Sequence, residues 1–351
     1  MMRVVSGVFV VCLVLAAYGC STISYYARSI NGQLDVLGSR VAISELLAAP
    51  DTPDPLRENL KRVLDIRDFA STKLALPDNN SYRLYADLKR PYAVWAVFAA
   101  PEFSLELEQW CFLIVGCVNY RGYFSKDRAI QFAEQLSKES FDTYVADVPA
   151  YSTLGWFDDP ITNTVIDWPE ATLAALIFHE LAHQTVYIKD DSGFNESFAT
   201  AVAEIGVERW LASRPKALSG WHKQKRRRRI ITSVLLDTRE QLKKLYESKL
   251  GKTNMRQAKK DALDELKRSL DDLRTKWQIT DKDWFRQTPN NARLGSAATY
   301  HHFVPAFHRL FQREAQDMKR FYAAVTALGD LPRKERYQTL KRLMPANNLT
   351  E

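Results

Sequence analysis

The chain has 351 residues, of which 46% are hydrophobic and 26% are charged, an ordinary balance for a globular protein with a substantial core. The formal net charge is +7, and the basic run Lys223–Arg229 contributes much of it. Such a run can contact nucleic acid or anionic lipid, but no nucleic-acid-binding module accompanies it. We therefore expect no nucleic-acid partner, and we interpret the run as a solvated helix start or a membrane-surface contact.

The first twenty residues predict export. A basic start precedes an apolar run, Val4–Ala17, that is about as long as a signal-peptide core and short for a membrane span. The segment ending Leu-Ala-Ala-Tyr-Gly-Cys20 resembles a lipobox, although Tyr18 is an unusual residue before the glycine. We expect residues 1–19 to be a lipoprotein signal peptide and Cys20 to carry the lipid; an ordinary signal peptide and an uncleaved anchor are the alternatives. Because Ser21 follows the cysteine, as in lipoproteins sorted to the outer membrane, we expect a lipid-anchored protein of the bacterial cell envelope that faces the periplasm.

The remaining cysteines predict a disulfide. Cys12 lies in the apolar run and Cys20 is the expected lipid site, which leaves Cys111 and Cys117. In an oxidising compartment, an even pair separated by five residues can close a tight hairpin-like loop. No other Cys or His is close in sequence, so we do not expect a metal site there.

The pattern before residue 150 changes from helix to strand. Apolar spacing predicts mostly helical structure over residues 21–47, and prolines at 50, 53 and 55 end it. Alternating apolar residues then indicate a small sheet. The expected elements are helices at Leu56–Leu74 and Lys126–Ser140 and strands at Tyr92–Phe98, 112–115, Val118–Phe124 and Thr143–Val148.

The next segment, Pro169–Leu211, contains His179-Glu180-Leu181-Ala182-His183. Good helix formers precede the motif, and a proline suits the first turn of such a helix. His179 and His183 are four residues apart, so they project from one face and can reach one metal ion. Glu180 lies beside them, where it can act as general base toward water, as in H-E-x-x-H metalloproteases.

A second helix follows a polar turn and predicts the third ligand. Glu196 lies thirteen residues after His183, near the start of this helix, and two His plus one Glu is a known ligand set of catalytic zinc. The Asn-Glu-x-Phe-Ala sequence resembles the gluzincin pattern, with a shorter spacer than is usual. The segments at 99–104, 121–124 and 150–160 resemble a bacterial family of zincin-like aminopeptidases.

This resemblance covers nearly the whole mature chain and implies a helix-rich α+β fold of the zincin type. A small sheet would precede the H-E-x-x-H helix, and an edge strand would pair with the extended substrate. The implied cofactor is one Zn²⁺ per chain, held by His179, His183 and Glu196. The implied substrate is a peptide or protein.

After Leu211 the chain is expected to be largely helical. Long helices are predicted at Lys223–Leu250, Asn254–Trp277 and Thr299–Leu328, with a short one at Arg333–Leu343. The highly charged 223–277 part predicts a helical hairpin that covers the metal site or stands away from it. We expect residues 20–351 to form a single domain with this hairpin as an excursion; no feature specifies an oligomeric state.

Further residues are candidates for catalytic or substrate-binding roles because of their position relative to the motif. Tyr151 and Tyr300 are candidates for stabilising an oxyanion, as are His301 and His302, with simple burial as the alternative for each. Glu204 can orient a ligating histidine or lie at the surface. Glu102 is the candidate for binding the substrate's α-ammonium group, with Asp158 and Asp159 as further carboxylates near the motif; all three can instead cap turns.

We therefore expect a zinc metallopeptidase in which Glu180 is the general base. The resemblance implies an aminopeptidase, yet the Gly-x-Met-Glu-Asn strand of the well-known zinc aminopeptidases is missing, so an endopeptidase remains an alternative. A non-enzymatic envelope lipoprotein with a structural zinc site is the second alternative. A closed metal site would distinguish it, because catalytic sites keep a position for water.

Overall fold

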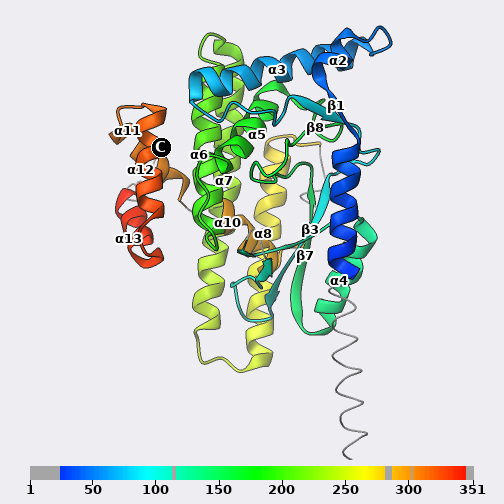
Figure 1. The fold of residues 1–351 in the computed structure, drawn as a ribbon. Helices are drawn as coiled ribbons and strands as arrows, with labels where there is room; N and C mark the ends of the chain where they lie inside the picture. The colour runs from blue at the N-terminus through cyan, green and yellow to red at the C-terminus, as the bar shows by residue number, and fades with distance from the viewer. Residues whose placement is uncertain (1–23, 113–115, 281–286, 302, 345–351) are drawn as a thin grey trace, which may run out of the picture.

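The computed structural model describes residues 24–112, 116–280, 287–301 and 303–344, and of residues 298–301 it describes only the backbone. Long helices dominate, and three small sheets lie among them (Figure 1). The predicted helix-rich α+β class is therefore confirmed. The predicted lipid site Cys20, and His302, lie outside the described residues.

The first helix ends earlier than predicted. Residues 24–38 are helical, strand β1 (Arg40–Ala42) follows, and α2 (Ile43–Ala48) and α3 (Asp54–Leu74) complete this region. The strand forms because β1 pairs antiparallel with β2 (Leu84–Ala86), which pairs parallel with β8 (Ile161–Thr162). Strands of two or three residues are too short to show an alternating pattern, so the prediction missed all three.

A second sheet has the order β6-β3-β7 and is antiparallel throughout. Its strands are β3 (Val94–Pro101), β6 (Arg121–Tyr123) and β7 (Phe141–Val148). Alternate residues of β3 face opposite sides: Trp95 and Val97 pack against α4 (Lys126–Lys138), whereas Ala96 and Phe98 face α10 (Asn291–His301). Both faces of the sheet are thus covered by a helix.

The third sheet is a hairpin closed by the predicted disulfide. Strands β4 (Trp110–Phe112) and β5 (Gly116–Val118) place Cys111 directly opposite Cys117, and the two sulfurs are bonded. The hairpin is bonded to Asp190, whose Oδ1 accepts a hydrogen bond from the Cys117 amide at 2.6 Å, and its Phe112 and Trp110 rings pack on Tyr25 and Phe132. Gly116 has φ +76° and lies so close to Asp190 that no larger residue fits there.

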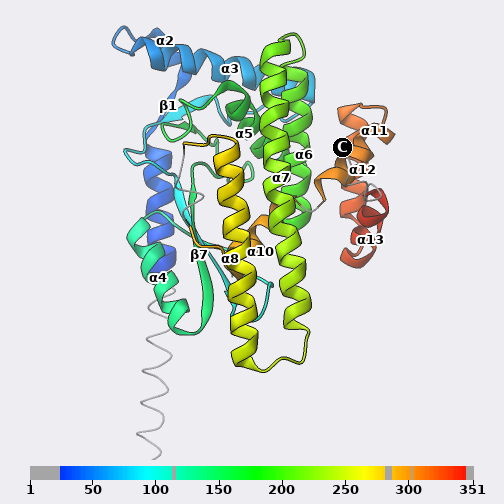
Figure 2. The ribbon, with the colours of Figure 1, turned by 180° about the vertical axis from the view of Figure 1, so that it is seen from behind.

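The main core is built around α5 (Glu170–His183) and α6 (Ser192–Trp210), which are antiparallel neighbours joined by a short loop (Figures 1 and 2). The side chains of Phe178, Phe194 and Phe198 are fully buried between these helices and their neighbours. Gly206 allows the close approach, because a Cβ there would lie 2.5 Å from the Phe178 ring. The helix that carries the H-E-x-x-H motif is therefore one of the most deeply buried elements.

The C-terminal half is helical, as predicted, and α7 (Pro215–Tyr246) and α8 (Lys252–Lys276) form the expected hairpin. The single helix predicted at Thr299–Leu328 is wrong: α10 ends at His301, and α11 (Val304–Arg313) and α12 (Met318–Gly329) follow. Pro305 starts α11, and Ala315 and Gln316 take positive φ values between α11 and α12. The last helix, α13 (Arg333–Leu343), has its predicted bounds. Within the described residues no helix is both long and apolar enough to cross a membrane.

Candidate metal centre

His179, His183 and Glu196 meet where the C-terminal turn of α5 faces the first turn of α6. The Nε2 atoms of the two histidines are 3.2 Å apart, and Oε2 of Glu196 lies 3.2 Å from His179 Nε2 and 3.7 Å from His183 Nε2. Among the described His, Cys, Asp and Glu residues, these three form the group whose ligand atoms all lie within 4.8 Å of one another. The structure thus brings together the three residues that the sequence nominated as ligands.

This donor set fits a divalent metal ion. A zinc ion with bonds of about 2.0–2.1 Å holds the ligand atoms of a tetrahedral site about 3.3 Å apart, close to the spacing observed. Two imidazole nitrogens and a carboxylate in mutual contact need either shared protons or a central cation. Burial raises the pKa of Glu196, but His183 and His179 outweigh this effect and hold that pKa below its usual range. The neighbouring histidines therefore favour the ionised form of the Glu196 carboxylate.

Glu180 lies beside this group and is buried, with 8% of its surface exposed. Burial is the main cause that raises its pKa, and the carboxylates of Glu196 and Asp159 add to the effect, while the two histidines oppose it. A carboxylate in such surroundings is a better proton acceptor than an exposed one. Burial and these neighbours thus favour the protonated form of Glu180 more than exposure to water would.

Asn195, the neighbour of Glu196, fixes the loop between the two ligand helices. Its side-chain oxygen accepts a hydrogen bond from the Ile188 amide at 2.8 Å, and its Nδ2 donates to the Ile188 carbonyl at 2.7 Å. The side chain is buried, so these bonds are shielded from water. The clamp sets the start of α6, and with it the position of Glu196, against α5.

Asp191 caps the same end of α6 and ties it to the C-terminal helix. Its Oδ1 accepts from the Phe194 amide, and its Oδ2 accepts from both Nε and Nη2 of Arg336 at 3.0 and 2.6 Å. Tyr337 donates a further bond to Asp191 at 2.6 Å. Asp191 and Arg336 are both buried, so α13 supports the ligand helix through a buried ion pair.

Three tyrosines near the site were missed from the sequence. Burial raises the pKa of Tyr120, Tyr187 and Tyr82, and in each case carboxylates of the site contribute: Glu196 for the first two and Glu180 for the third. Tyr187 lies four residues after His183, beyond the end of α5, and its ring packs near the His183 ring; its closeness in sequence to the motif could have indicated it. Tyr120 and Tyr82 come from distant segments, and no local pattern marks them.

Of the two tyrosines nominated from sequence, the structure describes the side chain of Tyr151 and not that of Tyr300. Tyr151 donates a hydrogen bond to Gln33 at 2.5 Å and packs on Phe124, so its hydroxyl is engaged by the N-terminal helix. Tyr300 and His301 lie in the last turn of α10, and their side chains are outside the described part of the chain. Tyr120 and Tyr187 are therefore the described tyrosines whose pKa the candidate ligand Glu196 helps to raise.

The remaining candidate carboxylates lie outside the ligand group. Glu204 accepts from His308 at 2.8 Å rather than from a ligating histidine, and the buried Nδ1 of His183 has no partner among the described residues. Glu102 forms two hydrogen bonds with Arg256 of α8. The backbone carbonyl of Asp158 accepts from Arg40, and Asp159 is buried and accepts from the backbone and side chain of Thr153.

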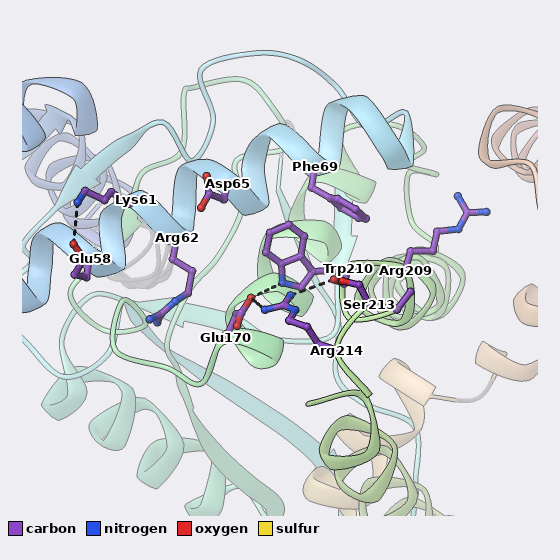
Figure 3. A pocket seen from close by; sticks show the side chains of 11 residues that line it. Glu58, Lys61, Arg62, Asp65, Phe69, Glu170, Arg209, Trp210, Ser213 and Arg214 are labelled. Atoms are coloured by element: carbon purple, nitrogen blue, oxygen red, sulfur yellow. Dashed lines mark hydrogen bonds and ion pairs between the residues drawn. The ribbon is translucent and has the colours of Figure 1, made fainter. Parts of the chain in front are cut away.

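The larger of two described surface cavities, about 740 Å³, lies at the opposite end of α5. Figure 3 shows Glu170 in its wall, bonded to Trp210 and Arg214. Glu170 is the first residue of α5 and His179 lies nine residues further, about 14 Å along the helix. This cavity is therefore separate from the candidate metal centre.

Comparison with known proteins gives one match. The family model that matches the chain is described as "Putative aminopeptidase" and covers residues 24–340. No curated protein and no solved structure matches the chain. The matched range includes both ligand helices, the supporting loop and Arg336, so the chain belongs to this aminopeptidase family.

Proposed function

We propose that the protein is a zinc-dependent metallopeptidase. The observation that carries this proposal is the convergence of His179, His183 and Glu196 beside the buried carboxylate of Glu180. Family membership supports peptide-bond hydrolysis as the reaction. A zincin-like architecture belongs to the same proposal, supported by the order of elements: an antiparallel sheet, then the ligand helix, then a second ligand helix.

His179, His183 and Glu196 would hold the zinc ion, which when bound polarises the substrate carbonyl and lowers the pKa of water. Glu180 accepts a proton from the attacking water and passes it to the leaving amine. One peptide bond and one water molecule are thereby converted into a carboxylate and an amine. Tyr187, whose ring lies near that of His183, is the candidate for donating a hydrogen bond to the developing oxyanion.

A non-enzymatic protein with a structural zinc site is the alternative. A structural site normally has four protein ligands, whereas the described residues supply three and add a carboxylate that is not needed for binding. The additional carboxylate, Glu180, favours an enzyme.

Substitution of Glu180 tests this proposal directly. Glu180→Gln is expected to keep about one zinc per chain and to lower turnover of a peptide library by roughly 10²–10⁴-fold, because the base is lost while the ligands stay. His183→Ala and Glu196→Ala are expected to lose the metal. Glu134→Gln, which removes an exposed carboxylate from α4, is the matched control and should change neither quantity. Zinc loss in Glu180→Gln, or full zinc retention in Glu196→Ala, would contradict the assigned roles.

The end of the peptide that is cleaved is a separate question. Family membership favours an aminopeptidase, which must bind a free α-ammonium group with a carboxylate. The carboxylate nominated from sequence, Glu102, is engaged by Arg256, whereas the buried carboxylate of Asp159 contributes to raising the pKa of Glu180. An aminopeptidase should cleave free peptides and spare their N-acetylated forms; equal cleavage of both would identify an endopeptidase.

We also propose attachment to the bacterial envelope through a lipid on Cys20, with the enzyme facing the periplasm. The signal-like segment and the disulfide between Cys111 and Cys117 support an oxidising destination. Cys20→Ser is expected to abolish acyl labelling in cells. Labelling that persists in this variant would refute the lipid site.

A further inference from the structure

A second cavity, of about 520 Å³, lies between the helix at residues 24–38, strand β6 and helix α4. In both ribbon views this first helix runs beside α4 (Figures 1 and 2). None of the residues lining the cavity belongs to the candidate metal centre. Its volume is within the range of about 300–1,000 Å³ that is typical of small-molecule sites.

The wall of this cavity is strongly basic. Four arginines line it, and Asp35 is the one carboxylate among its lining residues. Elsewhere, arginines such as Arg256 and Arg336 are paired with carboxylates. Within the described part of the chain, the four cavity arginines form no ion pair, so their charge is left for a ligand. These arginines are Arg28, Arg90, Arg121 and Arg128.

Two of the arginines are held in place without losing their charge. The guanidinium of Arg121 lies 3.9 Å from the centre of the Tyr25 ring and 4.7 Å from that of Phe132. Stacking on a ring leaves the in-plane N–H groups of a guanidinium able to donate. Arg90 donates to the carbonyls of Tyr92 and Ala93 and also lies over Phe124. The cavity thus presents fixed, planar donors, the arrangement that matches phosphate oxygens.

The other two arginines, Arg28 and Arg128, are exposed and come from two different helices. They can close on a ligand from both sides, because neither has a carboxylate partner among the described residues. Ser24 also lines the cavity, only four residues after Cys20, and four residues of chain span at most about 14 Å. If Cys20 carries a lipid as proposed, the cavity lies within reach of the headgroup layer.

We propose that this arginine-lined cavity binds a phosphate group, carried either by an anionic lipid headgroup or by a free phosphate ester. The charge, the stacked donors and the volume define the chemistry. The position near residue 20 favours the lipid source. This site is independent of the metal centre and of the peptidase reaction.

Calorimetric titration of the purified full chain tests the proposal with three probes. Short-chain phosphatidylglycerol should bind, and short-chain phosphatidylcholine, whose headgroup carries no net charge, should bind at least tenfold more weakly. Glycerol phosphate distinguishes the two possible ligands. If it binds tightly, the ligand of the cavity is a free phosphate ester. If it binds weakly while phosphatidylglycerol binds tightly, the ligand is a lipid headgroup. Equal binding of the two lipids, or no binding of any probe, would overturn the proposal.

Variants locate the binding. Arg28→Gln/Arg128→Gln should weaken binding of the preferred probe at least tenfold, because both side chains are exposed and unpaired within the described chain. The matched control is Arg268→Gln/Arg313→Gln, which removes the same charge from exposed positions on α8 and α11. Peptidase activity and zinc content report on folding in each variant. Equal weakening in both double variants would show general charge attraction and would refute a site.

Discussion

Glu204 is a buried carboxylate that joins three helices. From α6 it accepts from His308 of α11 at 2.8 Å and pairs with Lys225 of α7 at 3.1 Å. Burial alone would raise its pKa, but the hydrogen bond from His308 and the charge of Lys225 lower it to about 2. The ionised form is therefore part of the folded structure, and Glu204 belongs to the framework rather than to the metal centre.

This environment predicts a pH-dependent loss of stability in Glu204→Gln. Because the folded-state pKa is depressed, the charge stabilises the fold above the unfolded-state value near 4.5, and the benefit disappears as pH falls toward 2. The expected loss at pH 7 is on the order of 3 kcal/mol. Urea unfolding of both proteins at pH 7, 5 and 3 measures it, and the difference should shrink at pH 3.

Glu208→Gln is the control, since Glu208 also binds Lys225 but is partly exposed. An exposed pair contributes at most about 1 kcal/mol, so this variant should stay close to the parent. A Glu204→Gln difference that does not depend on pH would show that the loss comes from packing instead of charge.

Asn195 holds the loop between α5 and α6 in place through its bonds to Ile188. Replacing its side chain is expected to weaken metal binding although Asn195 is not itself a candidate ligand. Asn195→Ala breaks both bonds to Ile188 and leaves its partly buried amide without this acceptor, a loss of about 1–3 kcal/mol in unfolding free energy, while the Ile188 carbonyl still accepts from the Asp191 amide. Because Glu196 is the next residue, zinc affinity should fall roughly tenfold. Competition with a chelator measures the affinity.

Asn59 is half-buried, but its side chain donates to Asp167 in a solvent-exposed hydrogen bond, so it supplies the control. Asn59→Ala should leave both zinc affinity and unfolding free energy nearly unchanged. Unaltered zinc affinity in Asn195→Ala would mean that α6 holds Glu196 in place without the clamp.

Replacing either of two helical glycines by alanine is expected to change the stability of the protein, with opposite sign at the two positions. Gly206 faces Phe178 at a contact where a Cβ would lie 2.5 Å away, so Gly206→Ala should destabilise by about 1–3 kcal/mol through overpacking. Gly220 lies in α7 with nothing near a new Cβ, so Gly220→Ala should stabilise by about 0.4–1 kcal/mol. Thermal unfolding of the two variants tests this prediction. A change of the unfolding temperature in the same direction in both variants would refute the close packing of α5 and α6.

The long helices and the ligand set could be predicted because their information is local. The spacing of apolar residues indicated α5, α6 and α13, and His179, His183 and Glu196 lie within eighteen residues of sequence. Residues brought to the site by the fold could not be found this way. The buried Tyr82, whose pKa the Glu180 carboxylate helps to raise, follows a loop that is held by Arg67, which donates to the carbonyls of Ser81, Pro77 and Asn79.

At the scale of the whole molecule, the candidate metal centre depends on both ends of the chain. Burial of α5 requires α3 from the N-terminal part, and α11 to α13 cover α6 from the other side (Figure 2). The β4–β5 hairpin contacts the loop between the ligand helices through Asp190. The family match has a similar extent, since it begins at residue 24 and ends at 340. These contacts indicate that the centre forms only in the complete fold.

Arg336 provides a test of this dependence, because it lies 145 residues after its partner Asp191. Arg336→Met keeps the aliphatic packing but leaves the Asp191 carboxylate buried without its cation. Breaking a buried pair in this way costs about 3–5 kcal/mol. The N-cap of α6 should loosen at the same time, so we expect weaker zinc binding as well as a lower unfolding free energy. Arg342→Met, on the exposed side of the same helix, should change neither. If Arg336→Met destabilises the protein but binds zinc as tightly as the parent, the first turn of α6 keeps its geometry without α13, and the centre is more local than the contacts of Asp191 indicate.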